Sequence, residues 1–336
     1  MNRILAMMIA LVGLIGCSCG KGTGTKGMTG AYSKAGKPSE EEKAIFSAVV
    51  SPYVEPKLKA EKVLRQVVAG TNYCFVCKDP DGKRVEVVVY APLPGNGDPG
   101  ITSVNGEELM DDFPGNSPIF ITPSGKPLRI ACIFHGSLAF EYEGNVIHID
   151  PVTQMGEMKI DYSAFGKADA IFITHSHHDH LCPEAIENMS GEETALFANA
   201  ESVSSLGKGT VLANGDSGEL SDGIRYTAVP AYNTTEGREM FHPKGKGNGY
   251  FFNFDGFRVY VAGDTEPIEE MSELGSIDLA FLPVNHPYTM TISQCVEAAE
   301  LIRPKTLIPY HYSDTDLSGL PVMLKGMEVK IFESLR

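Results

Sequence analysis

The sequence contains 336 residues, of which 43% are hydrophobic and 21% are charged, so it has the composition of a globular protein and the length of two domains. Its formal net charge at pH 7 is −15, and no basic cluster offsets the excess of acidic residues. A surface of this charge repels polyanions, which excludes a nucleic-acid-binding protein.

The first residues have the pattern of an export signal. The positive charge of Arg3 precedes the apolar run Ile4–Ile15, which is too short to cross the ~30 Å core of a bilayer as a helix but suits a secretion signal. The tetrapeptide that ends at Cys17 resembles a bacterial lipobox, and this resemblance implies removal of residues 1–16 and lipidation of the cysteine. Residues 17–30 are glycine-rich and polar, as expected of a flexible tether.

These patterns together predict an exported protein that is anchored by a lipid to a bacterial membrane, facing the periplasm or the cell surface. An ordinary secretion signal that is cut nearby and a short buried helix are the alternatives.

Residues 31–108 predict a small domain with one helix and an antiparallel sheet. Ser39 and Glu42 have the spacing of a capping box, and apolar residues at helical spacing follow them. Three β-rich runs come next, separated by the turn-forming segments 69–70 and 79–82. A helix that lies across the sheet would bury the apolar faces of both.

Two turns of this domain resemble the inhibitory hairpins of the cystatin and stefin family, and Gly30 lies where that family has its N-terminal trunk. The residues that carry the resemblance are Gln66, Val67, Val68, Ala69 and Gly70 in the first hairpin and Leu93, Pro94 and Gly95 in the second. The family inhibits papain-like cysteine proteases by inserting these segments into the active-site cleft, so the resemblance implies such a protease as a partner. Glycine and proline are also what any tight hairpin requires, and that alternative stays open.

A polar, turn-rich segment, residues 109–118, predicts a linker to a second domain at residues 119–336. In the second domain, short apolar runs repeatedly end in, or lead directly to, a residue that can bind a metal: Asp150, His175, Asp264 and His311. Continuous apolar runs are typical of strands that are buried on both faces, and rigid scaffolds present reactive groups on the loops after such strands. We therefore expect these residues to meet at one edge of a sheet.

The segment Thr174–His180, with the sequence THSHHDH, concentrates four histidines and one aspartate behind an apolar run. A chance match to H-x-H-x-D-H has a probability on the order of 10⁻⁶ per window, so chance is a poor explanation. In a tight loop, His175 and His177 can converge on one cation while Asp179 and His180 face another. Such ligands suit Zn²⁺ and are tolerated by Mn²⁺.

Together with the later segments Gly263–Thr265 and Pro309–His311, this motif resembles that of the metallo-β-lactamase superfamily. The segments HPKGKGNGY, VAGDTE, FLPVNHPYTMT and PKTLIPYHY are most similar to its branch of ascorbate-6-phosphate lactonase-like hydrolases. The resemblance covers residues 119–336 and implies an αβ/βα sandwich with metal ions at one edge between two sheets. The expected fold class is thus α+β in two domains, a cystatin-like helix on an antiparallel sheet and then a metallo-β-lactamase sandwich.

The resemblance implies a centre with two divalent cations, Zn or Mn. It assigns His175 and His177 to the first cation, Asp179, His180 and His311 to the second, and Asp264 to a bridging position between them.

The third ligand of the first cation is where this sequence departs from the superfamily. Residues 229–233, where a histidine is usual, read Val-Pro-Ala-Tyr-Asn. His242 is the preferred substitute, because the glycines after it would let its loop fold back over the site, and His286 is the alternative.

Other polar residues are candidates for supporting roles. Asp150 matches an acidic residue that supports the site by hydrogen bonding, and His135 lies on the first strand of the domain, where a half-buried strand residue is equally consistent. Lys244 lies among glycines whose amides could bind an anion, or in a solvated loop. His148 and His178 are open to an ordinary core or surface role.

Two cations that share a water lower its pKa and supply hydroxide at neutral pH, which Asp179 and Asp264 would orient through the metals. The expected activity is hydrolysis of an ester, lactone, amide or phosphodiester bond, first of all in an anionic small molecule. The alternative is a membrane-tethered protease inhibitor or interaction protein that acts through the cystatin-like hairpins.

Overall fold

The computed structural model describes residues 30–221 and 223–336. Cys17, the predicted signal of residues 1–16 and nearly all of the predicted tether lie outside the described residues. Among the residues that are described, no helix has the length and apolar character needed to cross a membrane. The chain divides into two compact units, one reaching to Pro52 and continuing at Lys57–Leu109, the other formed by Tyr53–Pro56 and Met110–Arg336.

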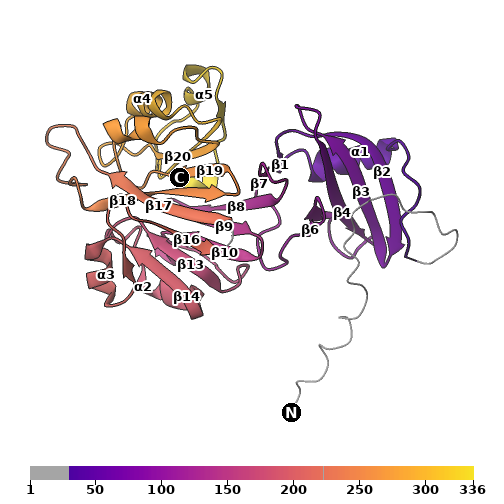
Figure 1. Ribbon diagram of the computed structural model, residues 1–336, viewed down its shortest axis with the longest axis horizontal. Coiled ribbons are helices and arrows are strands. Elements are labelled where there is room, and N and C mark those ends of the chain that lie inside the picture. Colours follow the sequence, from indigo (N-terminus) through magenta and orange to yellow (C-terminus); the bar gives the residue numbers. More distant parts are fainter. Residues whose placement is uncertain (1–29, 222) are drawn as a thin grey trace, which may run out of the picture. The chain divides into compact units, whose positions relative to one another are not determined.

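Among its described residues, the first unit contains one helix and a five-stranded antiparallel sheet (Figure 1). Helix α1, Glu40–Val49, begins at the predicted capping box, where the Ser39 hydroxyl accepts from the amide of Glu42 and the Glu42 carboxylate accepts from the amide of Ser39. The strands lie in chain order: β2 Lys59–Val68, β3 Gly70–Lys78, β4 Arg84–Pro92, β5 Gly100–Val104 and β6 Glu107–Glu108. Phe46 of the helix packs against Phe75 of β3, with ring centroids 5.1 Å apart, so helix and sheet share a core.

Two hairpin turns lie at the same end of this sheet. The β2–β3 turn closes at Gly70, which pairs with Pro92 at the end of β4, where the β4–β5 turn begins. The Tyr90 hydroxyl donates to the carbonyl of Ala69 at 2.6 Å and ties the turns together. A Cβ at Gly70 would lie 2.5 Å from the carbonyl oxygen of Ala91, so this position requires glycine.

The second unit contains two large sheets and a two-stranded ribbon. The eight-stranded sheet has the order β1 Val54–Glu55, β7 Ile119–Ile121, β8 Pro127–Phe134, β9 Ser137–Tyr142, β10 Asn145–Ile149, β13 Ala168–Ile173, β14 Ser190–Ala198 and β15 Thr210–Val211. The seven-stranded sheet follows chain order: β16 Ser217–Ser221, β17 Ile224–Ala231, β18 Gly247–Phe254, β19 Phe257–Val261, β20 Leu279–Pro283, β21 Thr306–Tyr310 and β22 Glu328–Val329. The ribbon pairs β11 Gln154–Met155 with β12 Met158–Lys159.

The helices of this unit are short and connect the strands (Figure 1). They are α2 Pro183–Met189, α3 Ala200–Leu206, α4 Ile292–Ile302 and α5 Leu320–Met323, with the 3₁₀ turns η1 Glu269–Glu273 and η2 Glu333–Leu335.

The two large sheets pack face to face around an aromatic core. Phe252 of the seven-stranded sheet lies 5.0 Å from Phe172 and 5.5 Å from Phe140 of the eight-stranded sheet, measured between ring centroids. Ile186 of α2 packs against the outer face of the eight-stranded sheet at Ile171, and α4 packs against β20 of the other sheet. The sequence of layers is helix, sheet, sheet, helix, which confirms the αβ/βα sandwich expected for this part of the chain.

Parallel strands bring the chemistry-bearing residues to one edge. β10, β13 and β14 pair in parallel in one sheet, and β19, β20 and β21 do so in the other. Because parallel strands end at the same edge of a sheet, the loops that follow them are neighbours. Asp150, the Thr174–His180 loop, Asp264 and His311 follow β10, β13, β19 and β21.

The structure differs from the predicted linker in one respect. Residues 109–118 are polar in sequence, but Phe113 is only 3% exposed, and the carbonyls of Met110 and Phe113 accept hydrogen bonds from the guanidinium of Arg129. This segment is therefore packed into the second unit over most of its length. Residues 53–56 also belong to that unit, where β1 pairs with β7.

Candidate metal centre

The motif loop connects β13 to α2 and buries the side chains of Thr174, His175 and His180, while those of His177 and His178 are exposed. The backbone amides of His180 and Leu181 both donate to the carbonyl of His177, at 3.0 and 2.8 Å, so the loop closes in a tight turn. This turn buries His175 and His180, which are 6% and 0% exposed, whereas the side chain of His178 is 95% exposed. His178 therefore faces solvent and has the surface role that its variable position in the motif allowed.

Three imidazoles form a first group of potential ligands. Nε2 of His175 lies 2.9 Å from Nδ1 of His177, and ligand atoms of these two residues and of His242 lie within 4.8 Å of one another. His242 is carried by the loop after β17, where its carbonyl accepts from the amide of Asn233 at 2.9 Å. Nδ1 of His242 faces the carbonyl of Tyr288 at 3.1 Å, which directs Nε2 toward the other two imidazoles.

His286 does not join this group. Its side chain is exposed, and it belongs to none of the ligand groups formed by the described residues. The carbonyl of Tyr288, two residues later, contacts His242 instead. This loop thus contacts the centre through its backbone, and the structure brings His242, not the alternative His286, to the group.

Asp179, His180 and His311 belong to a second group, whose ligand atoms also lie within 4.8 Å of one another. Nε2 of His311 is 3.5 Å from Oδ2 of Asp179, and Nε2 of His180 is 3.8 Å from the same oxygen. His311 follows β21 with a φ of +50°, an uncommon conformation for a residue with a side chain. Such strained positions cluster at functional sites, where the surrounding structure holds them.

Asp264 lies between the two groups. Its Oδ2 is 3.2 Å from Nε2 of His242 and 3.3 Å from Nε2 of His311, and its Oδ1 is 3.4 Å from Nε2 of His180. The preceding Gly263 has a φ of +67°, and a Cβ there would lie 2.7 Å from a backbone oxygen of β18. A glycine is therefore needed to place this carboxylate between histidines of both groups.

Asp150 supports the centre from behind. Its carboxylate accepts from the amide and the hydroxyl of Thr174, at 2.7 and 2.6 Å, and faces Nδ1 of His180 at 2.7 Å. Because Nδ1 of His180 is held in this way, Nε2 is directed toward Asp264. Asp150 is in none of the ligand groups found among the described residues, in keeping with a supporting role.

Burial and mutual proximity determine the charges of these groups. Burial lowers the pKa of His175 and of His177, and neighbouring imidazoles lower both further, so each is neutral and can donate a lone pair. Burial alone would raise the pKa of Asp264, but the charges of His311 and His180 hold it well below its ordinary value. Burial alone would lower the pKa of His180, but Asp264 and the supporting carboxylate behind it hold that pKa well above its ordinary value. A divalent cation would replace the proton that His180 otherwise carries.

Several buried polar atoms of the centre lack a hydrogen-bond partner within the described ranges. They are Nε2 of His135, His180, His242 and His311, and Oδ1 of Asp264. Each such atom costs about 1–3 kcal/mol, so a concentration of them in one place needs a partner that the chain itself does not supply. Imidazole nitrogens and carboxylate oxygens at these spacings fit divalent cations such as Zn²⁺ or Mn²⁺.

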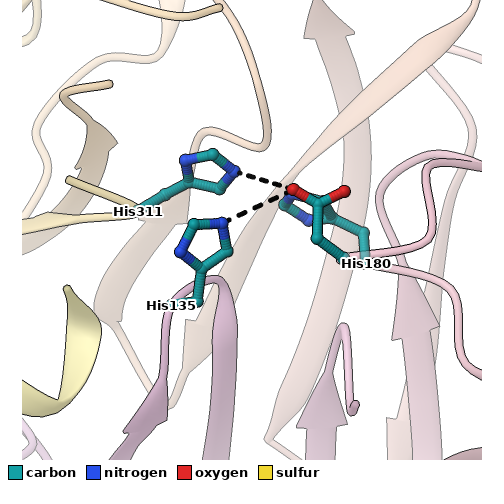
Figure 2. Close-up of side chains that lie close together, drawn as sticks. His135, His180 and His311 are labelled. Atoms are coloured by element: carbon teal, nitrogen blue, oxygen red, sulfur yellow. Dashed lines mark ion pairs between the residues drawn. The ribbon is translucent and has the colours of Figure 1, made fainter. Parts of the chain in front are cut away.

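His135, directly after β8, also belongs to the second group of potential ligands. Figure 2 shows that its ring and that of His311 point to one carboxylate: Nε2 of each is 3.5 Å from Oδ2 of Asp179. The two rings are close, with centroids 3.7 Å apart. His135 is 3% exposed, so it is not the half-buried strand residue that its sequence position also allowed.

Lys244 does not face the centre. Its ammonium lies 2.9 Å from the hydroxyl of Tyr232, 3.0 Å from Oε1 of Glu270 and 4.5 Å from the centroid of the Tyr232 ring. Tyr232 itself belongs to the segment in which the histidine of the superfamily is missing. The charge of Lys244 is thus engaged in a local ion pair with Glu270.

No motif in the sequence predicts how the loop with His242 is anchored. Glu266 and Arg238 form a buried ion pair, and the Glu266 carboxylate also accepts from the amides of Thr234 and Thr235 at 2.8 and 2.6 Å. The sequence feature that indicates this anchoring is Glu266, an acidic residue directly after Gly263–Thr265. Its partners are mainly backbone amides, which a sequence motif does not specify.

Comparisons with known proteins concern the second unit. A family model described as a beta-lactamase superfamily domain matches residues 129–311. A UPF0173 metal-dependent hydrolase of Pyrococcus abyssi (strain GE5 / Orsay) is 32% identical over 189 residues, which are 54% of this chain and 83% of that protein.

Two solved structures resemble the same part. A protein named as a metal-dependent hydrolase, from Parabacteroides distasonis ATCC 8503, is 50% identical with a TM-score of 0.62, over 65% of this chain and 98% of that one. Igni18, a metallo hydrolase from the archaeon Ignicoccus hospitalis KIN4/I, is 25% identical with a TM-score of 0.53, over 62% of this chain and 96% of that one.

Proposed function

We propose a function from the premise that the chain belongs to the metallo-β-lactamase superfamily and is a metal-dependent hydrolase of the UPF0173 family. Its second unit uses two divalent cations to hydrolyse an ester, lactone or phosphodiester bond of an anionic small molecule. The observation that carries the proposal is the position of Asp264, whose oxygens lie 3.2–3.4 Å from histidines of both ligand groups. A carboxylate placed in this way can hold two cations at a fixed separation.

The side chains divide the centre into two positions. His175, His177 and His242 would hold the first cation, Asp179, His180 and His311 the second, and Asp264 would contact both. When bound, such a pair of cations lowers the pKa of a water molecule and stabilises the negative charge that develops on a substrate oxygen.

The chain's own contribution is to fix these side chains before the substrate arrives. Asp150 and Thr174 hold His180 from behind, and the carbonyl of Tyr288 holds His242. Groups that are oriented in advance need not reorganise during the reaction, which is the main source of electrostatic catalysis. His175, His180, His242, Asp264 and His311 are buried, which limits the access of bulk water to them and strengthens these interactions, while His177 lies at the exposed side of the centre.

An anionic substrate would be bound mainly by the cations themselves. The ammonium of Lys244 is paired with Glu270 and so is not free to bind the substrate. The preference for an anion therefore rests on the charge of the metal centre and on the lactonase-like segments of the sequence.

The proposal is tested with the full chain, produced without a polyhistidine tag, stripped of metal and then loaded with Zn²⁺ or Mn²⁺. Elemental analysis should find bound cations, and a panel of lactones, carboxyl esters and phosphodiesters should contain a substrate. Asp264→Asn, a nearly isosteric change, should lower both metal content and turnover, while the exposed His178→Asn should change neither. A loaded protein that cleaves no member of the panel would contradict the proposed reaction, and equal turnover in Asp264→Asn would contradict the proposed centre.

A second candidate function concerns the first unit, where apolar side chains are exposed at one end of the sheet. Val67, Val68 and Leu93 at the two hairpin tips are 72%, 44% and 53% exposed. The carbonyl of Gly30 accepts from Nε2 of Gln66 at 2.6 Å, so Gly30 lies at the same end. We propose that this end binds a protein, and that a papain-like cysteine protease is the first partner to test.

The test measures papain activity in the presence of excess full-length protein. Inhibition should be lost in Val67→Asp and Leu93→Asp, which introduce charge at exposed tips without altering the core. Asp81→Ala, in the turn at the opposite end of the sheet, is the matched control. Papain that stays fully active would remove the protease as a partner.

We also propose that the protein is exported and anchored through a lipid on Cys17. The support is the sequence alone, an apolar run followed by a lipobox-like tetrapeptide. Radiolabelled palmitate should be incorporated into the protein in a bacterial host, and Cys17→Ser should abolish this and release the protein from the membrane fraction. An unlabelled protein in the cytoplasmic fraction would refute the assignment.

A further inference from the structure

We infer that His135 is a fourth side-chain ligand of the second cation, so that the two cation positions differ in coordination number. The inference rests on the proposed metal centre but goes beyond it, because the superfamily motif assigns only Asp179, His180 and His311 to this position, with Asp264 as the bridge. His135 lies outside that motif, after the first long strand of the second unit.

The distances around His135 are those of a ligand. Its Nε2 is 3.5 Å from Oδ2 of Asp179, the same separation as that of His311, and one atom each of His135, Asp179, His180 and His311 lie within 4.8 Å of one another (Figure 2). Donor atoms that share one cation at bonds of about 2.0–2.2 Å lie roughly 3–3.5 Å apart. His135 therefore has the spacing of the ligand beside it.

The orientation of the ring supports the same role. Nδ1 of His135 faces a backbone oxygen of Arg336 at 3.4 Å, as Nδ1 of His242 faces the carbonyl of Tyr288 at 3.1 Å. Histidines that bind metals commonly place their second nitrogen against a carbonyl oxygen, which fixes the ring. Nε2 of His135 is buried and has no hydrogen-bond partner in the described part of the chain.

The backbone holds this ring in a strained position. His135 has a φ of +51°, its amide donates to the carbonyl of Ser334 at 3.1 Å, and its carbonyl accepts from the amide of His311 at 3.2 Å. A side chain at positive φ costs free energy and persists where neighbouring contacts fix it. His135 and His311 are thus linked through the backbone as well as through Asp179.

A different role for His135 would be that of a positioning residue, which donates a hydrogen bond to the carboxylate of Asp179. Charge-assisted hydrogen bonds of this kind are about 2.7–2.9 Å long, whereas the observed separation is 3.5 Å. The distance fits two ligands on one cation better than a donor and its acceptor. A metal-loaded structure separates the two roles directly.

The consequence is an unequal pair of positions. The first has three imidazoles and Asp264, a set of four donors that suits tetrahedral Zn²⁺. The second gains His135 and then has five donors, which suits a five- or six-coordinate cation such as Mn²⁺. The two positions should therefore differ in affinity and in metal preference.

The test replaces His135 by asparagine, which tolerates positive φ but is too short to reach the cation. Metal-free wild type and His135→Asn are titrated with Zn²⁺ and with Mn²⁺, and stoichiometry and affinities are measured by calorimetry and elemental analysis. For each metal, we expect the binding of one of the two bound ions to be weakened more than about 100-fold in the variant, while the binding of the other ion is unaffected. Loss of a residue that only hydrogen-bonds to a ligand weakens binding by about 10–100-fold, so the expected effect is larger than that. His178→Asn, an exposed histidine of the motif loop, should bind both as wild type does.

Each outcome is decisive. The inference is overturned if His135→Asn binds both cations with wild-type affinity, or if the affinities for both are weakened equally and modestly. Either result leaves the hydrolase proposal intact. A wild-type protein that binds no cation would overturn the proposed centre itself. If His135→Asn does not fold, a crystal structure of the Mn²⁺-loaded wild type decides. Nε2 of His135 within about 2.3 Å of the ion supports the inference, and a separation above about 3 Å refutes it.

Discussion

Replacement of His148 by leucine should remove a large part of the acid sensitivity of the second unit. His148 lies on β10, two residues before Asp150, but on the side away from the metal centre. It is 0% exposed, it packs 5.0 Å from the ring of Phe165 and 5.8 Å from that of Tyr162, and neither ring nitrogen has a hydrogen-bond partner in the described residues. The core role that its sequence position allowed is the one it has.

Burial lowers the pKa of His148 from 6.5 to about 3, because the apolar surroundings cannot solvate an imidazolium. The unfolded chain therefore binds a proton here below about pH 6.5 that the folded chain does not bind until about pH 3, and stability falls as the pH falls through this window. At pH 5 the difference of 1.5 pH units from the unfolded pKa corresponds to about 2 kcal/mol, or roughly 4–8 °C in melting temperature for a unit of this size. His148→Leu has nearly the same volume and no group to protonate, so it should not show this loss.

The measurement compares metal-free wild type and His148→Leu at pH 7.5 and pH 5. Hydrogen exchange of peptides from β10 under increasing urea reports the free energy of unfolding of this unit alone. Other groups titrate equally in both proteins, so the difference between the two pH dependences isolates His148. At pH 7.5 the variant should be as stable as wild type or more so, since an unsatisfied buried polar group has been removed. If both proteins lose the same free energy between the two pH values, the imidazole is solvated or partnered, and the reasoning is wrong.

Three further changes test the support of the metal centre. Gly136→Ala would place a Cβ 2.9 Å from Cε1 of His180, and it should lower the free energy of unfolding, measured in urea, by about 1–3 kcal/mol. In the control Gly115→Ala the added Cβ meets no other part of the protein within 4 Å, so its free energy of unfolding should stay within about 0.5 kcal/mol of wild type. Thr174→Val removes the hydroxyl that donates to Asp150 at 2.6 Å and should weaken metal binding about 10–100-fold by calorimetry; unchanged affinity would show that this bond does not orient the centre. Removal of metal by a chelator should abolish turnover and lower the melting temperature, because the cations bind only the folded chain; a melting temperature that does not respond to added Zn²⁺ or Mn²⁺ would contradict this.

The strand-end residues of the second unit were predictable because periodicity and motif spacing encode them. Apolar runs that end in Asp150, Asp264 and His311 imply parallel strands with ligands at one edge, and the sandwich has that arrangement. Helix α1 was predictable for the same reason, since its capping box is local in sequence. Features set by neighbouring residues or by strand ends are thus within reach of the sequence.

Features that depend on distant backbone were not predictable. The carbonyl of Tyr288 fixes the orientation of His242. His286, whose imidazole made it the candidate ligand of this loop, is exposed. A backbone oxygen has no residue-specific signature, so no motif identifies it. The packing of residues 109–118 was hidden for a related reason, because Phe113 and Ser117 are buried in a segment whose composition resembles a linker.

The missing histidine at residues 229–233 has a structural consequence for the first cation position. In this chain the strand end carries Tyr232, whose hydroxyl binds Glu270, so the third imidazole must come from a loop that returns to the centre at His242. A loop contributes little order of its own, and the buried ion pair of Glu266 with Arg238 provides the anchoring that a strand would otherwise give. The second position has no such dependence, since its ligands directly follow strands or lie in the tight motif turn. In the proposed centre, the first position therefore depends on a loop and its buried ion pair, whereas the second depends on strand ends and the motif turn.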